Sequence, residues 1–198
     1  LESMNTQVLP ETLSIIENRR RPRIQGSRWC DAEGLPTSQR AIVENGKLMG
    51  WTLDLSTGRK LGMDSTASAT RSVSAPPSPS VSHIALTQGD QSQADLLRDM
   101  GTGLLVTSMI GSTINPNTGD YSRGANGFWV ENGEIAYPVN ECTIAGNLRD
   151  MLLRIVTATD ATPHLSRGVP PVFIGRTTLD GNARSYPAAR TPVRRRVG

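Results

Sequence analysis

Two segments of the chain have the pattern of a tight β-hairpin. In residues 40–55 and again in residues 127–139, strand-forming residues flank the dipeptide Asn-Gly, at positions 45–46 and 132–133. Both central residues of a type I′ turn need positive φ, which asparagine and glycine tolerate, and the twist of that turn matches the flanking strands. We therefore expect two antiparallel hairpins.

Three other apolar runs predict further strands. TLSII at residues 12–16 is rich in β-branched side chains, and PVFIGRTT at residues 171–178 is expected to be the last strand. LLVTSMI at residues 104–110 is uninterrupted by charge and is predicted to be buried on both faces. Strands that do not alternate regularly with helices favour antiparallel pairing.

Helical spacing occurs in two places. Residues 89–100 combine a capping Ser92, an acidic residue three positions later and Gly101 after the last apolar position. Residues 143–157 place apolar side chains on one face, with Asn147 as the expected N-cap. Together these elements predict an α+β fold, a mostly antiparallel β-sheet or barrel-like domain with about two helices.

Two segments lack any hydrophobic period. Residues 64–92 are rich in Ser, Thr, Ala and Pro, and they predict a long loop because proline cannot donate to a β-ladder. The alternative is an ordered arm that packs on a partner or over a site. Residues 182–198 are expected to be disordered or peripheral.

Composition narrows the class of protein. The chain has 198 residues, which is long enough for one domain with a hydrophobic core. Only 36% of the residues are apolar and 4% aromatic, which predicts a large share of loops. No run approaches the roughly 18 apolar residues that a membrane-spanning helix needs, which argues against a membrane protein. Two cysteines are too few for a disulfide scaffold.

The charge is basic overall but unevenly placed. A net charge of +3 and a pI of about 9.2 raise the hypothesis of a nucleic-acid-binding module. However, residues 182–198 hold five arginines and no acid, and without them 16 basic residues face 18 acidic ones. A second arginine cluster lies at residues 19–23, but few aromatic residues are available to stack on bases. Nucleic acid is therefore the less favoured partner.

The residue types that usually carry catalysis are scarce. His83 and His164 are isolated in predicted loops and are expected to be solvated, whereas Cys30 and Cys142 are expected to be small buried side chains. The chain has no HExxH, no GxSxG, no phosphate-binding lysine loop and no GxGxxG. Residue patterns alone therefore predict no metal ligand and no catalytic residue.

One polar cluster is a candidate binding site. Asp120, Tyr121, Ser122 and Arg123 lie between two glycines and lead into an apolar strand. Glycine lets a backbone approach a ligand closely, and an arginine can hold a carboxylate through two parallel hydrogen bonds. The cluster is thus a candidate for peptide binding. The alternative is a tight structural turn with an internal Asp–Arg pair.

Four segments in order resemble the TldD/PmbA family, which contains proposed modulators of DNA gyrase that are also classed as metallopeptidases. They are DAEGLPT at 31–37, PPSPS at 76–80, NPNTGDYSRGANGFWVENGEIAYPV at 115–139 and TIAGNLRDM at 143–151. The resemblance is nearer to the PmbA branch, also called TldE. It implies an N-terminal extension at 1–11, a C-terminal domain of that family at 12–181 and an arginine-rich tail at 182–198, disordered or non-native.

The resemblance also implies an activity. Family members are cytoplasmic two-subunit peptidases that process unfolded proteins or peptides, and a TldD-like subunit holds zinc with an HExxxH helix and a later cysteine. This chain has no HExxxH and no cysteine at 158–168, where the catalytic branch has that ligand. We therefore expect a non-catalytic chain without zinc or another cofactor of its own. Its role would be scaffold, subunit interface and wall of the peptide channel.

The expected partners follow from that role. They are a TldD-like catalytic subunit or a second copy of this chain, together with an unfolded peptide substrate and no membrane. The alternative function is a basic nucleic-acid-binding module linked to DNA gyrase modulation. In that case the arginine clusters would contact phosphates, and the binding would weaken steeply with salt.

Overall fold

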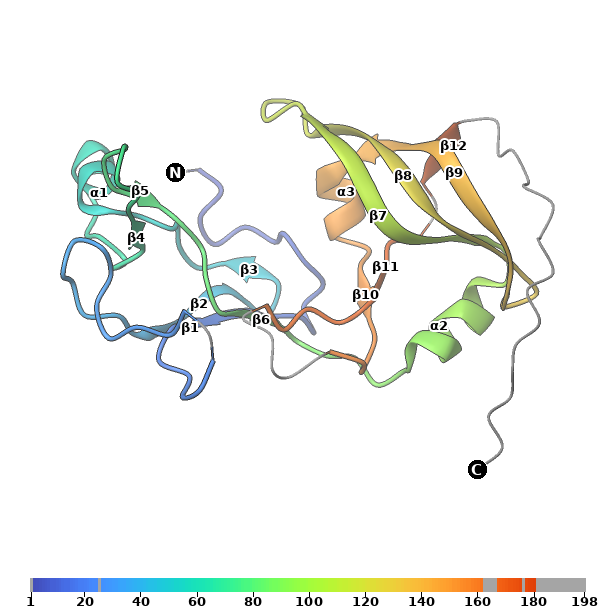
Figure 1. Ribbon diagram of the computed structural model, residues 1–198, viewed down its shortest axis with the longest axis horizontal. Coiled ribbons are helices and arrows are strands. Elements are labelled where there is room, and N and C mark those ends of the chain that lie inside the picture. Colours follow the sequence, from blue (N-terminus) through green and yellow to red (C-terminus); the bar gives the residue numbers. More distant parts are fainter. Residues whose placement is uncertain (1, 25, 162–166, 176, 181–198) are drawn as a thin grey trace. The chain divides into compact units, whose positions relative to one another are not determined.

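The computed structural model describes residues 2–24, 26–161, 167–175 and 177–180. The chain divides into two compact units (Figure 1), a first unit of Leu1–Gln93 with Arg149–Gly175 and a second unit of Ala94–Leu148 with Arg176–Gly198. The mostly antiparallel α+β class is confirmed, with three helices among the described residues. Within those residues neither four-stranded sheet closes on itself.

The main sheet of the first unit has the strand order β3-β2-β1-β6, all antiparallel. These strands are β1 (Ile15–Asn18), β2 (Gln39–Glu44), β3 (Lys47–Leu48) and β6 (Ile84–Leu86). Asn45 and Gly46 join β2 to β3 with φ of 48° and 77°, which confirms the predicted turn. The outgoing strand is much shorter than predicted.

The core of the first unit combines residues from both ends of its sequence. Leu9, Leu13 and Val43 are buried, and Leu152 and Ile155 pack against them. The returning segment also forms a two-stranded sheet, in which β10 (Val156–Thr157) pairs with β11 (Val172–Phe173). The apolar contacts therefore hold the returning segment to the first sheet.

The Ser/Pro-rich segment is partly ordered, so the prediction of one long loop over 64–92 is wrong. It contributes β4 (Ala69–Thr70) and β5 (Ser78–Pro79), which pair with each other, as well as β6 in the main sheet. Proline is tolerated here because β5 belongs to a two-stranded sheet, in which every strand is an edge strand.

A short helix, α1 (Leu55–Leu61), begins at the last residue of the predicted first hairpin. Asp54 caps it, since Asp54 Oδ1 accepts a 2.6 Å hydrogen bond from Thr57 N, and Gly62 ends it in the left-handed region with φ of 65°. Asp54 is buried. Hydrogen bonds from the Thr57 side chain and backbone lower the pKa of Asp54 below its ordinary value.

Loss of this cap is expected to destabilise the first unit in a pH-dependent way. Asp54→Ala should lower the free energy of unfolding by about 1 kcal/mol at neutral pH. Because the pKa of Asp54 is depressed on folding, its contribution is complete above the unfolded pKa of about 3.9 and is lost as pH falls through the folded pKa. Urea unfolding of wild type and variant from neutral pH downwards should therefore show two curves that converge in acid.

An exposed carboxylate provides the control for this experiment. Asp64→Ala removes a carboxylate from an exposed residue close in sequence, so its unfolding curve should stay close to wild type at every pH. A constant difference between wild type and Asp54→Ala down to the most acidic pH would contradict a charged cap.

The second unit is built on three long strands with the sheet order β12-β9-β8-β7. They are β7 (Gly103–Ile114), β8 (Asp120–Glu131) and β9 (Glu134–Asn147), and the short β12 (Thr178–Asp180) pairs with β9. Asn132 and Gly133, with φ of 52° and 79°, confirm the second predicted turn. Ala125, Val139, Cys142 and Ile144 form the buried core of this sheet.

Two further predictions are wrong. β7 is not buried on both faces but is an outer strand, and residues 107–111 are exposed. The predicted helix at 143–157 is instead the end of β9 followed by the five-residue α3 (Leu148–Leu152). Pairing of β9 with both β8 and β12 stabilises an extended backbone up to Asn147, the predicted N-cap, and the helical turn follows it.

The remaining helix is predicted correctly. α2 (Gln93–Met100) ends at Gly101, which has φ of 67° and whose N–H bonds to the Leu97 and Arg98 carbonyls. Among the described residues, none of the helices has the length and apolar character that crossing a membrane requires.

Candidate functional site

The four residues of the candidate cluster lie at the start of β8, but on two different faces. Side chains alternate along a strand, so Tyr121 and Arg123 share the face of the buried Ala125. Asp120 and Ser122 are exposed on the opposite face. The four residues are consecutive in sequence, but the structure divides them between two faces of the sheet and does not gather them into one pocket.

Asp120 is the first residue of β8 and contacts the turn that precedes this strand. Gly119 N donates to the Asn115 carbonyl at 2.8 Å, and Thr118 Oγ1 donates to Asp120 Oδ2 at 2.7 Å. None of the ion pairs within the described ranges joins Asp120 to Arg123. Asp120 thus stabilises the turn through Thr118.

Arg123 is a partly buried cation. Its Nε is shielded from solvent and has no hydrogen-bond partner in the part of the chain that the structure describes. On one side it pairs with Ile144 of β9, and on the other side β7 has an irregularity that contains Gly111, with φ of 80°. A desolvated N–H without an acceptor is unfavourable, so a carboxylate ligand would stabilise this side chain.

β7 has one unpaired edge among the described residues of the second unit. β8 pairs with one edge of β7, and no described strand pairs with the other, as Figure 1 shows. Met109, Ile110 and Ile114 are exposed along it, with Ile110 at 63%. Such an edge offers N–H and C=O groups to which an extended polypeptide can add as a further strand.

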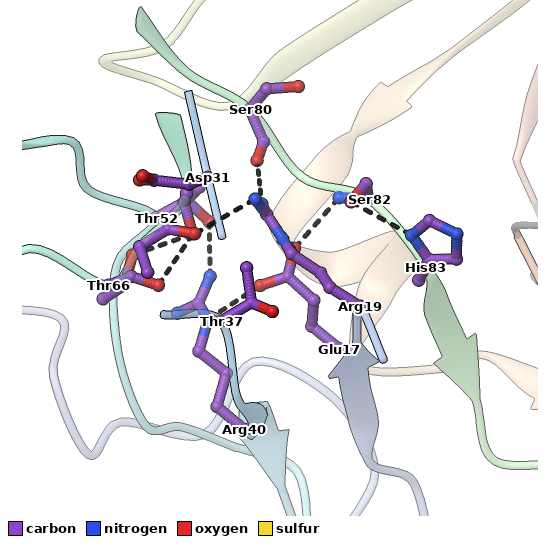
Figure 2. Close-up of polar contacts among 12 residues, drawn as sticks. Glu17, Arg19, Asp31, Thr37, Arg40, Thr52, Thr66, Ser80, Ser82 and His83 are labelled. Carbon is purple, nitrogen blue, oxygen red and sulfur yellow. Dashed lines mark hydrogen bonds and ion pairs between the residues drawn. The ribbon is translucent and has the colours of Figure 1, made fainter. Parts of the chain in front are cut away.

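A buried polar cluster in the first unit was not predicted from the sequence. Its centre is Glu17, which is 1% exposed (Figure 2). Glu17 Oε1 accepts from Arg19 Nη2 and from Ser82 N, both at 2.9 Å, and Oε2 accepts from Arg40 Nε at 2.7 Å. The sequence signal is weak, because Arg40 becomes the partner of Glu17 only through the register of β1 and β2.

The two arginines of this cluster also bind backbone carbonyls. Arg19 donates to the carbonyls of Ala67 and Ser80, and Arg40 donates to the carbonyl of Trp51 at 2.9 Å. Each charged group therefore has several partners, and the cluster ties the Ser/Pro-rich segment to the main sheet. This saturation favours a structural role over a catalytic one.

The DAEGLPT segment has a similar structural role. Asp31 is buried, and its carboxylate accepts backbone hydrogen bonds from Glu33, Leu35 and Ala69. Thr37 Oγ1 donates to the Arg28 carbonyl at 2.7 Å. These contacts close the loop between β1 and β2.

Among the described residues, His83, Cys30 and Cys142 belong to no group of side chains that could hold a metal. His83 is 2% exposed, so the prediction of a solvated side chain is wrong, and its Nδ1 lies 3.2 Å from Ser82 Oγ beside the Glu17 cluster. Cys30 is exposed, contrary to prediction, whereas Cys142 is buried as predicted. His164 lies outside the described residues.

The described residues do not fit a zinc ion. Across the described ranges, no three His, Cys, Asp or Glu side chains are grouped so that they could hold a metal. A protein zinc site needs three or four such ligands around one point. No catalytic step through a metal can therefore be assigned to these residues.

Comparison with known proteins gives one consistent family. The family description "PmbA/TldA metallopeptidase C-terminal domain" matches residues 1–181. A metalloprotease PmbA homolog of Haemophilus influenzae is 44% identical over 183 residues, covering 92% of this chain and 39% of the relative. The metalloprotease PmbA of Escherichia coli O157:H7 is 43% identical over 157 residues, covering 79% and 33%. The chain thus spans less than half the length of these relatives.

Solved structures agree with this comparison. The crystal structure of a proposed modulator of DNA gyrase from Bacteroides thetaiotaomicron has a TM-score of 0.78 and 28% identity, covering 92% of this chain and 39% of that one. TldE from Thermococcus kodakarensis has a TM-score of 0.79 and covers 90% of this chain and 42% of its own. At 22% identity, this second likeness concerns the fold alone.

Proposed function

The chain belongs to the TldD/PmbA metallopeptidase family, and on that premise we propose that it is the C-terminal domain of a PmbA-like subunit of a cytoplasmic peptidase. In this proposal the domain is a scaffold, a subunit interface and one wall of the path of an unfolded polypeptide. Zinc and the catalytic groups belong to a TldD-like partner subunit, and a second copy of this chain is the alternative partner.

The observation that carries the proposal is the unpaired outer edge of β7. This strand has 12 residues, Gly103–Ile114, which is enough to pair with an extended peptide over several residues. Backbone pairing gives affinity with little dependence on side-chain identity, which suits a protein that handles unfolded polypeptides. Exposed apolar residues along β7 add contacts on its faces.

Arg123 is the member of the candidate cluster that fits this role best. It lies on β8, the strand next to β7, and its desolvated Nε lacks an acceptor within the described residues. A carboxylate of the added peptide would satisfy it through a charge-assisted hydrogen bond. Asp120 and Ser122, on the opposite face, remain candidates for polar contacts with the same peptide.

Selective methylation of peptide amides is expected to reveal strand addition. A strand presents alternate N–H groups to its neighbour. A short neutral peptide that is N-methylated at one alternate set of amides should therefore lose about tenfold or more in affinity, whereas methylation of the other set should leave binding nearly unchanged. Fluorescence anisotropy of the labelled peptide with the full chain measures both.

A pair of matched variants tests whether the peptide binds at β7. Lysine blunts an edge strand, so Ile110→Lys on β7 should weaken peptide binding several-fold. Ile135→Lys, at another exposed isoleucine on β9, should not. Equal effects of the two methylation sets would contradict strand addition. Zinc-dependent, chelator-sensitive cleavage of the peptide by this chain alone would contradict a non-catalytic role.

A further inference from the structure

One exposed feature of the first unit is not used by the function proposed above. It is a surface made of Arg20, Arg23, Arg28 and Trp29, named here the arginine–tryptophan patch. All four residues are exposed, and the Trp29 side chain is 75% exposed. The Arg20 guanidinium lies 5.2 Å from the centroid of the Trp29 ring, within range of a cation–π interaction.

The backbone holds the patch in place. Arg28 N donates to the Arg19 carbonyl at 3.0 Å, so the two ends of the loop that carries the patch are joined. Thr37 N donates to the Trp29 carbonyl at 2.8 Å. Arg19 itself is 3% exposed and is bound to Glu17, so the buried cluster of Figure 2 anchors one end of the patch.

The positive charge of the patch is not balanced by the carboxylates that follow it in sequence. Residues 18–30 contain five arginines and no acid. Asp31 is occupied by three backbone N–H groups, and Glu33 Oε2 accepts a 2.9 Å hydrogen bond from Leu55 N. Arg19 is paired with Glu17, whereas none of the ion pairs within the described residues involves Arg20, Arg23 or Arg28. Arg20, Arg23 and Arg28 thus point to an anionic ligand.

The aromatic component narrows the class of ligand. Tryptophan and arginine are the residues most enriched among strongly contributing interface residues, because they combine a large apolar area with directional hydrogen bonding. A single-stranded nucleic acid usually stacks on several aromatic rings along a charged groove. This patch has one ring, and Arg20 already covers one of its faces. A carboxylate-rich polypeptide needs only forked guanidinium groups and one apolar contact.

We propose that the arginine–tryptophan patch binds an acidic segment of the polypeptide that this domain takes as substrate. Arg23 and Arg28 hold Asp or Glu carboxylates of that segment, and the open face of Trp29 contacts its aliphatic groups. This inference rests on the proposed peptide-handling role, but it concerns a surface separate from β7. It adds a preference for acidic segments to backbone pairing that is insensitive to sequence.

The test compares two short peptides of equal length in binding to the full chain. One contains a run of Asp and Glu, and the other has Asn and Gln at the same positions. The acidic peptide should bind about tenfold more tightly at low salt, and the difference should shrink as salt screens the charges. Equal affinity of the two peptides would overturn the inference.

Charge-matched variants assign the preference to the patch. The double variant Arg23→Gln with Arg28→Gln should remove most of the preference for the acidic peptide. The double variant Arg59→Gln with Arg71→Gln removes the same charge from exposed positions elsewhere in the first unit. This control variant should retain the preference for the acidic peptide. Equal losses in both double variants would mean non-specific attraction and would overturn the proposal. Trp29→Ala should weaken the acidic peptide several-fold without changing the neutral one.

Two further outcomes separate this inference from the proposed function. Single-stranded DNA of matched charge is the first comparison. If it binds more tightly than the acidic peptide, and if this binding depends on Arg23 and Arg28, the peptide assignment is overturned. The neutral methylated peptides report β7 pairing alone. If their pattern is as expected while acidic and neutral peptides bind equally, only the inference fails. If their pattern fails while the patch variants act as expected, only strand addition fails.

Discussion

Replacing Glu17 by alanine is expected to unfold the first unit or to reduce its free energy of unfolding by about 3–5 kcal/mol. The substitution leaves the Arg19 guanidinium, which is 3% exposed, without its carboxylate and removes the anion that Arg40 contacts at 2.7 Å. A buried charge without a counter-ion is far less favourable than the same charge in water. Since a domain is stable by only about 5–15 kcal/mol, the loss is large.

Urea unfolding followed by hydrogen exchange measures this effect, because exchange reports each unit separately. Glu44→Ala, at an exposed position of β2, is the matched control and should change the free energy of unfolding by less than about 0.5 kcal/mol. Protection should fall in β1, β2 and the Ser/Pro-rich segment. Near-wild-type stability of Glu17→Ala would contradict the account of the cluster.

Replacing all three charged residues tests whether Glu17→Ala is unstable because it leaves buried charges without a partner. A triple variant, Glu17→Leu with Arg19→Met and Arg40→Met, removes the charges together. It should be more stable than Glu17→Ala, because apolar side chains of similar volume replace buried ion pairs at little cost. Lower stability of the triple variant would mean that the carbonyls bound by the arginines, such as that of Ala67, contribute more than the ion pairs do.

The second large effect is expected at Gly127, in the middle of the long sheet. A Cβ there would clash with the Leu105 carbonyl oxygen, and would lie 2.9 Å from its carbonyl carbon and 3.0 Å from Val106 Cα. All three atoms belong to the backbone of β7, so no side-chain rotation relieves the clash. Gly127→Ala should therefore cost about 3 kcal/mol, the upper end of the range for overpacking.

A second glycine of the same strand provides the control. At Gly124 a Cβ would meet its nearest neighbours in Ile110 at 3.6 and 3.7 Å, which is ordinary van der Waals contact. Gly124→Ala should therefore be tolerated. Hydrogen exchange should show lost protection in β7 and β8 for Gly127→Ala alone, while protection of β1 and β2 persists. Loss of protection throughout both units would contradict separate compact units.

The parts of the structure that were predicted correctly depend on neighbours in sequence. Asn45-Gly46 and Asn132-Gly133 determine their turns because the need for positive φ is local to those residues. The same holds for α2, where Gly101 ends the helix. The family could be recognised for a related reason, since the resemblance rests on short runs of consecutive residues such as DAEGLPT and the segment around the second turn.

Two failed predictions concern residues whose surroundings come from distant parts of the chain. Residues 143–147 belong to a segment predicted to be helical, yet two partner strands hold them extended. His83 is near the end of a polar segment, but β6 brings it beside the Glu17 cluster and buries it. The candidate cluster is not among these failures, since its role in peptide binding stays a prediction. Only the tertiary structure shows that Asp120 and Arg123 lie on two faces of β8, because a strand alternates its side chains.

The sequence by itself thus determined the family, the α+β class, the two Asn-Gly turns and the end of α2, because each depends on residues close together in the chain. Only the tertiary structure decided that β7 is an outer strand, that Glu17 is buried between Arg19 and Arg40, and that Arg20 stacks on Trp29. The physical reason is that burial, register and charge pairing depend on which distant segments meet, and the free energy of those contacts exceeds local conformational preference.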